Sequence, residues 1–143
     1  FDVNKLASVK INEIWKIPNN FIRGTLIENK LAQTIYKGYE HLGSSVSKYF
    51  KYIDFYDEIS QIGISLKSVN AKSNFNFRNI MKNIDDLAFA KNAGSIVSNG
   101  TERIIKDVRL DIVIPKGYDR GVLNKVEKYA NHKKVKINIF EVE

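Results

Sequence analysis

Two segments near the C-terminal end alternate apolar residues with other residues, and a stretch with helical spacing separates them. Apolar side chains occupy every second position over 108–114 and again over 135–139. Alternation with a period of two is typical of β-strands. Between the segments, Asp119 is suited to cap a helix whose apolar face falls within 122–129. A strand, a short helix and a strand in this order predict a βαβ crossover with two parallel strands.

The rest of the chain predicts further helices and a hairpin. Asp57 and Glu58 form a turn signal between two β-prone runs, and Gly94 is suited to end a helix. The predicted elements are helices over 5–15, about 21–39 and about 77–92, and strands over 49–56 and 62–69. We therefore predict an α/β (α+β) fold, a central mixed β-sheet flanked by helices, in a single domain over 1–143.

The composition excludes several classes of function. Cysteine is absent, which excludes disulfides, zinc–thiolate sites and thiol catalysis. The only two histidines, His41 and His132, are too few for a three-histidine metal site. No apolar run approaches the ~20 residues of a membrane span. Because the chain opens at Phe1 without methionine, we expect it to be the C-terminal fragment of a longer protein.

The charge balance is basic. The chain has 23 Lys and Arg against 16 Asp and Glu, a formal net charge of +7. A basic small domain often binds a polyanion, which can be nucleic acid, an acidic membrane or an acidic protein. Charge alone leaves open that the domain binds none of these.

Four residues carry the chemistry that this pattern favours. Ser65 and Lys67 stand two apart on one predicted strand and therefore project to the same side. Asp54 comes from the neighbouring strand, and Glu28 from a helix that packs against the sheet. Two carboxylates, a hydroxyl and an ammonium group suit metal-assisted hydrolysis of phosphodiester bonds. The alternative is that Asp54 forms a turn and that Glu28 and Lys67 are solvated surface residues.

Three short motifs add to this interpretation: Arg-Gly-Thr-Leu-Ile-Glu over 23–28, Tyr-Ile-Asp-Phe-Tyr-Asp over 52–57 and Gly-Ile-Ser-Leu-Lys-Ser-Val over 63–69. Together they resemble the PD-(D/E)XK nucleases. More narrowly, they resemble the toxin domains at the C-terminal ends of CdiA proteins, which bacteria use in contact-dependent growth inhibition. The resemblance covers roughly residues 21 to 72, about a third of the chain, and the second half is placed by pattern alone.

The resemblance implies an active site of four residues. Glu28, Asp54 and Ser65 would contact a divalent metal, either Zn²⁺ or Mg²⁺/Mn²⁺, and Lys67 would be the catalytic lysine. Ser65 stands where the broader superfamily has Asp or Glu. This departure removes one negative charge and leaves the metal affinity and the preferred metal in doubt. The superfamily's proline before the aspartate is Ile53 here, which is harmless because that proline does no chemistry.

The resemblance also implies a function. It predicts a metal-dependent DNase toxin that is delivered from the surface of the producing cell, acts in the target-cell cytoplasm and is neutralised by a cognate immunity protein. Three alternatives remain open: an RNase toxin of the same fold that cleaves tRNA, a non-catalytic nucleic-acid-binding module and a protein-interaction domain. Lys72, Arg78 and Lys82 follow the site and are candidates for contacts with a DNA backbone, or else form a solvated helix face.

Other residues have simpler interpretations. Glu40 is the only acid near the second helix that rivals Glu28, and we expect it to be solvated. Asp57 is expected to form the hairpin turn, and His41 and His132 to be surface residues and not general bases. An acidic immunity protein could cover the basic cleft or pair with a strand edge, for which the alternating stretch 103–114 is a candidate.

Overall fold

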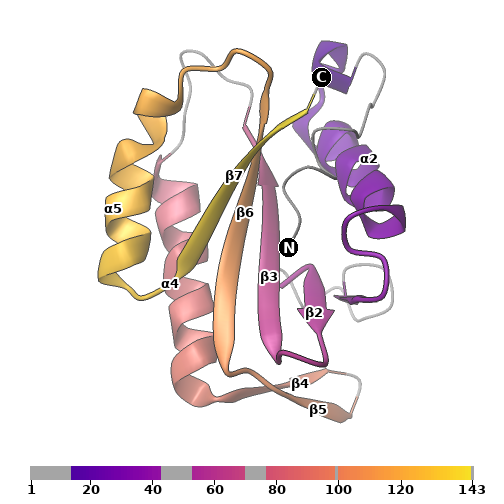
Figure 1. The fold of residues 1–143 in the computed structure, drawn as a ribbon, viewed down its shortest axis with the longest axis vertical. Helices are drawn as coiled ribbons and strands as arrows, with labels where there is room; N and C mark the ends of the chain where they lie inside the picture. Colours follow the sequence, from indigo (N-terminus) through magenta and orange to yellow (C-terminus); the bar gives the residue numbers. More distant parts are fainter. Residues whose placement is uncertain (1–13, 43–52, 70–76, 99, 143) are drawn as a thin grey trace.

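A five-stranded mixed sheet organises the fold, with strands in the order β1-β2-β3-β6-β7 (Figure 1). The computed structural model describes residues 14–42, 53–69, 77–98 and 100–142. The helices are α2 (Asn20–Gln33), α4 (Phe77–Ala93) and α5 (Asn124–His132), with short 3-10 turns η1 (Ile14–Lys16) and η2 (Arg120–Leu123). The strands are β1 (Glu40–His41), β2 (Phe55–Asp57), β3 (Ile62–Ser68), β4 (Ser95–Ser98), β5 (Thr101–Ile104), β6 (Asp107–Pro115) and β7 (Lys136–Val142).

The predicted hairpin is β2 and β3, which pair antiparallel with Phe55 opposite Ile64. Its turn forms at Asp57, whose carboxylate accepts hydrogen bonds from the Ile59 N–H at 3.1 Å and from the Ser60 hydroxyl. A carboxylate that bonds the backbone two residues further on stabilises a turn. The prediction that Asp57 is a turn former is therefore confirmed.

The βαβ unit is also confirmed, because β6 and β7 pair in parallel with Leu110 opposite Ile137. Asp119 caps the connecting helical segment, since its carboxylate accepts the Gly121 N–H at 2.8 Å. The segment begins as the 3-10 turn η2 and continues as α5. Strand β6 also pairs in parallel with β3, so it is an interior strand of the sheet, between β3 and β7.

Helices cover both faces of the sheet. Figure 1 shows α4 and α5 on one side and α2 on the other. Two buried apolar clusters fill the two interfaces. The α4/α5 cluster includes Ile84, Leu87, Val126, Leu110 and Ile112, and the α2 cluster includes Ile27, Leu31, Phe55, Ile64 and Val113. None of the described helices is long and apolar enough to span a bilayer.

Helix α2 ends at Gln33, earlier than the predicted end at Tyr39. The chain then turns, and the Tyr36 N–H donates to the Leu31 carbonyl at 2.9 Å. The Tyr36 side chain is fully buried against the sheet. Continued helix would change the direction of this ring, so tertiary burial decides where the helix ends. The predicted helix over 5–15 falls mostly outside the described residues, as do residues 49–52 of the predicted strand.

Two predictions about the middle of the chain need correction. Residues 95–98 and 101–104 form an antiparallel pair of strands, β4 and β5, that the sequence pattern did not predict. The candidate edge over 103–114 is wrong for most of its length, because β6 lies between β3 and β7. The residues of β6 from 108 to 114 are all buried, on both faces, which is typical of a central parallel strand. The edge strands are instead β1 and β7 of the five-stranded sheet and both strands of the β4–β5 sheet.

Candidate active site

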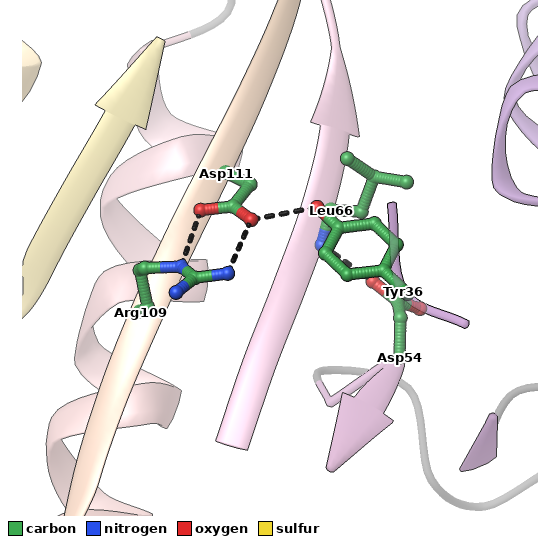
Figure 2. Close-up of polar contacts among 5 residues, drawn as sticks. All are labelled: Tyr36, Asp54, Leu66, Arg109 and Asp111. Atoms are coloured by element: carbon green, nitrogen blue, oxygen red, sulfur yellow. Dashed lines mark hydrogen bonds and ion pairs between the residues drawn. The ribbon is translucent and has the colours of Figure 1, made fainter. Parts of the chain in front are cut away.

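The candidate site lies where the pairing of β2 with β3 stops. The Asp54 N–H donates to the Ile64 carbonyl at 2.8 Å, as in a strand ladder. At the next position, the Asp54 carboxylate Oδ2 accepts the Leu66 N–H at 2.7 Å (Figure 2). A side chain has thus replaced the backbone as the partner of β3. This bond satisfies the Leu66 N–H and fixes the carboxylate beside the strand that carries Ser65 and Lys67.

Three nearby charged or titratable side chains, Glu28, Lys67 and His41, affect the pKa of Asp54. Burial and the Glu28 carboxylate raise the pKa of Asp54 to about 6, against the opposing effects of the Leu66 N–H, Lys67 and His41. Burial and the neighbouring Glu28 carboxylate thus both disfavour the charged form of Asp54. A bound cation would relieve this repulsion, so the charge pattern is that of a site for a positive group.

Glu28 reaches the site from α2. The helix buries Ile27 and Leu31 against the sheet. Glu28, which directly follows Ile27, lies at the border of that buried face, and its side chain is 26% exposed. Its Oε1 is 2.6 Å from Nε2 of His41 on β1. Glu40, the rival acid, instead pairs with Arg103 on β5. Glu40 is therefore a partly exposed surface residue, as expected, with Arg103 as its partner.

Ser65 and Lys67 lie on β3, on the side opposite Ile64 and Leu66, which face the α2 cluster. Ser65 is completely buried, and its hydroxyl has no hydrogen-bond partner among the described residues. Lys67 is partly exposed, and its ammonium group lowers the pKa of Asp54. An unpartnered buried hydroxyl is costly, so this oxygen is available to a ligand.

These residues suit a hard divalent cation. The Glu28 and Asp54 carboxylates and the Ser65 hydroxyl are all oxygen donors, which Mg²⁺ and Mn²⁺ prefer. Within the described residues, no three acidic or histidine side chains are close enough together to hold a metal ion. The donor set therefore fits a cation that has two carboxylates and completes its coordination with water and substrate oxygens, as hydrated Mg²⁺ does.

Among the described residues, no contact joins the predicted nucleic-acid-binding residues to this site. Arg78 and Lys82 are exposed and lie one turn apart on α4. Helix α4 covers the face of the sheet opposite α2 (Figure 1). Lys72 lies outside the described residues. The arrangement leaves Arg78 and Lys82 available to a polyanion that approaches along α4.

A buried polar network next to the site was not predicted. The Tyr36 hydroxyl donates to Asp111 Oδ2 at 2.6 Å, and Arg109 donates to the same carboxylate at 2.8 and 3.0 Å (Figure 2). Burial raises the pKa of Tyr36 well above its usual value, with Asp111 adding to the effect. Tyr36 therefore remains a donor. The signal in the sequence was an Arg and an Asp on one face of an otherwise apolar strand.

His41 was also misjudged. It was expected to be a surface residue, but its side chain is only 18% exposed and contacts Glu28. The imidazole also stacks on the Phe55 ring, with centroids 4.7 Å apart. His132, by contrast, is exposed at the end of α5, as expected.

Comparison with known proteins places the fold. A family model described as a CDI toxin restriction endonuclease-like domain matches residues 23–140. A solved structure of a CdiA-CT/CdiI toxin and immunity complex from Yersinia pseudotuberculosis is similar, with a TM-score of 0.59 and 22% identity, over 81% of this chain and 98% of that chain. No curated protein matches the sequence significantly. The predicted resemblance to CdiA toxin domains and the predicted fold are thus confirmed.

Proposed function

Since the chain belongs to the family of CDI toxin restriction endonuclease-like domains, we propose that it is a metal-dependent endonuclease toxin that hydrolyses phosphodiester bonds of DNA in a target bacterium. The observation that carries the proposal is the set of charges around Asp54. Glu28 raises the pKa of this carboxyl group and Lys67 lowers it, so both act on the same site. Carboxylates beside an ammonium group suit metal-assisted hydrolysis, because the carboxylates can hold a cation and the ammonium group can offset charge on a phosphate.

Each residue has a distinct role in the proposed reaction. Glu28, Asp54 and Ser65 hold a divalent cation, which, when bound, polarises a phosphoryl oxygen and acidifies a water molecule. The Leu66 N–H occupies Asp54 Oδ2 at 2.7 Å and orients the carboxylate. The Lys67 ammonium orients the attacking water and offsets charge that develops on the phosphate.

The substrate proposal is DNA, with contacts from Lys72, Arg78 and Lys82 to the phosphate backbone. The net charge of +7 supports binding to a polyanion. Neutralising phosphates releases counterions, so binding through these residues should weaken as salt increases.

The partner proposal is an acidic cognate immunity protein that neutralises the toxin. The similar solved structure is a toxin and immunity complex, and a basic domain is complementary to an acidic partner. In this proposal the domain is delivered from the surface of the producing cell and acts in the cytoplasm of the target cell.

Incubating the domain with plasmid DNA and with total RNA, side by side, tests the proposal. Each substrate is combined with Mg²⁺, Mn²⁺ or Zn²⁺ and with EDTA. We expect cleavage of DNA with a divalent cation and none in EDTA, and a loss of at least about 100-fold in Lys67→Ala. Lys128→Ala, an exposed lysine on α5, is the matched control and should retain activity. Cleavage of RNA alone would assign the other substrate, and full activity in EDTA would refute metal dependence.

A further inference from the structure

His41 binds the Glu28 side chain from a rigid position. The distance between His41 Nε2 and Glu28 Oε1 is 2.6 Å, and both side chains are largely shielded from solvent. A carboxylate oxygen can only accept, so Nε2 carries the proton and donates. A short hydrogen bond to an ionised group is among the stronger ones. It occupies Oε1 and leaves Oε2 of Glu28 for another ligand.

The imidazole is itself held by a stack of rings. Its plane lies within 19° of the Phe55 ring, at 4.7 Å between centroids. Phe55 stacks in turn on Tyr36 at 4.1 Å and 22°. Residues Phe55 and Tyr36 are both fully buried. Aromatic pairs in offset stacks have a preferred geometry, so the orientation of the first ring restricts that of the others.

The far end of the stack is tied to the centre of the sheet. The Tyr36 hydroxyl donates to Asp111, which Arg109 holds through two hydrogen bonds (Figure 2). Asp111 and Arg109 both lie on β6, an interior parallel strand. A continuous path of contacts therefore runs from the core to the Glu28 carboxylate.

Glu28 needs such support because a glutamate on a helix surface has several rotatable bonds. Holding such a side chain in one rotamer costs conformational entropy. Donors that orient a metal-binding carboxylate supply this order in advance. Among the described residues, His41 and the two carboxylates are not arranged to share a metal ion, which argues for support of Glu28 and against a third ligand.

We propose that His41 is the positioning residue for the Glu28 carboxylate, and that the stack of Phe55 and Tyr36 fixes the orientation of His41. This inference rests on the proposed function, because it assumes that Glu28 binds a divalent cation. It assigns to His41 no contact with substrate or metal.

The test is calorimetric titration of MnCl₂ into the metal-free domain, without nucleic acid. His41→Phe keeps a flat ring against Phe55 and removes the donor. We expect its Mn²⁺ affinity to fall by about 10- to 100-fold, and the amide donor of His41→Gln to recover part of the loss. His132→Phe, the matched control, should bind like the wild type. Wild-type affinity in His41→Phe would overturn the inference.

Glu28→Gln separates this inference from the proposed function. If Glu28→Gln loses Mn²⁺ binding while His41→Phe keeps it, the metal site stands and the role of His41 fails. If the wild type binds none of Mn²⁺, Mg²⁺ and Zn²⁺, both fail. A long-range ¹⁵N–¹H correlation spectrum of the metal-free wild type needs no variant. It should show a proton on Nε2 of His41, and a bare Nε2 would overturn the inference even if His41→Phe does not fold.

Discussion

The carboxylate of Asp54 accepts the backbone N–H of Leu66 at 2.7 Å, at the point where the backbone of β2 no longer pairs with β3. The bond satisfies a strand donor that would otherwise lack a partner and points the carboxylate along the strand of Ser65 and Lys67. The same carboxylate is largely buried beside Glu28, which raises its pKa to about 6. Asp54 therefore combines a fixed position with an unfavourable charge, the usual condition of a residue that serves function at the expense of stability.

The first prediction concerns stability and pH. Without metal, Asp54→Asn should be more stable than the wild type by about 1–2 kcal/mol at pH 8, because it removes a disfavoured charge and keeps an acceptor for Leu66. The folded-state pKa is raised, so the cost is complete above about pH 6. It disappears below about pH 4, where Asp54 is protonated in both states. Urea unfolding in EDTA at pH 8 and pH 4 measures the difference. A variant less stable at pH 8 would contradict the prediction.

The second prediction concerns metal addition. A cation that binds the folded protein stabilises it by about 2.7 kcal/mol at one hundred times its Kd. At pH 8, MnCl₂ should therefore raise Tm by about 5–10 °C. At pH 5 the increase should be much smaller, because protons compete for Asp54, whose pKa is about 6. Thermal unfolding followed by circular dichroism measures both. An equal rise in Tm at pH 8 and pH 5, or a rise in Tm that persists in Asp54→Asn, would exclude this carboxylate as a ligand.

The third prediction concerns Ser65, whose buried hydroxyl has no partner among the described residues. Ser65→Ala removes this oxygen and should stabilise the metal-free domain by up to about 1 kcal/mol. The same change should weaken Mn²⁺ binding. Ser68→Ala, on the same strand but partly exposed, is the control and should alter neither property. Urea unfolding and calorimetry give the two values, and unchanged Mn²⁺ affinity in Ser65→Ala would remove Ser65 from the site.

The fourth prediction concerns the buried network. Tyr36→Phe removes the hydroxyl that donates to Asp111 at 2.6 Å. The domain should lose about 1–3 kcal/mol, because a buried carboxylate is left with fewer donors. Tyr39→Phe changes a partly exposed tyrosine of the same turn and should cost little. Urea unfolding at pH 7 compares the two variants, and equal costs would mean that the Tyr36 hydroxyl has no special role.

Local patterns predicted the parts of the fold that local physics decides. The hairpin followed from alternation over 62–68 and a turn aspartate, Asp57. The βαβ unit followed from two alternating segments and the cap at Asp119. Tertiary burial decided the rest. Helix α2 ends early because Tyr36 turns into the core, and nothing near Tyr36 in the sequence indicates its partner, Asp111, which lies 75 positions away.

The candidate site shows the same division. The motifs placed Asp54, Ser65 and Lys67 on one hairpin. The structure puts Ser65 and Lys67 on β3 and Asp54 directly before β2, where its carboxylate accepts the Leu66 N–H. The surroundings of Glu28 were not predictable, because His41 reaches it through strand β1, whose pairing depends on residues of β2.

The most direct test of the central claim is the anomalous scattering of a crystal of the wild-type domain soaked in MnCl₂. We predict one Mn²⁺ peak that contacts carboxylate oxygens of both Glu28 and Asp54. A site that involves neither carboxylate, or no bound Mn²⁺ at saturating concentration, would contradict the account.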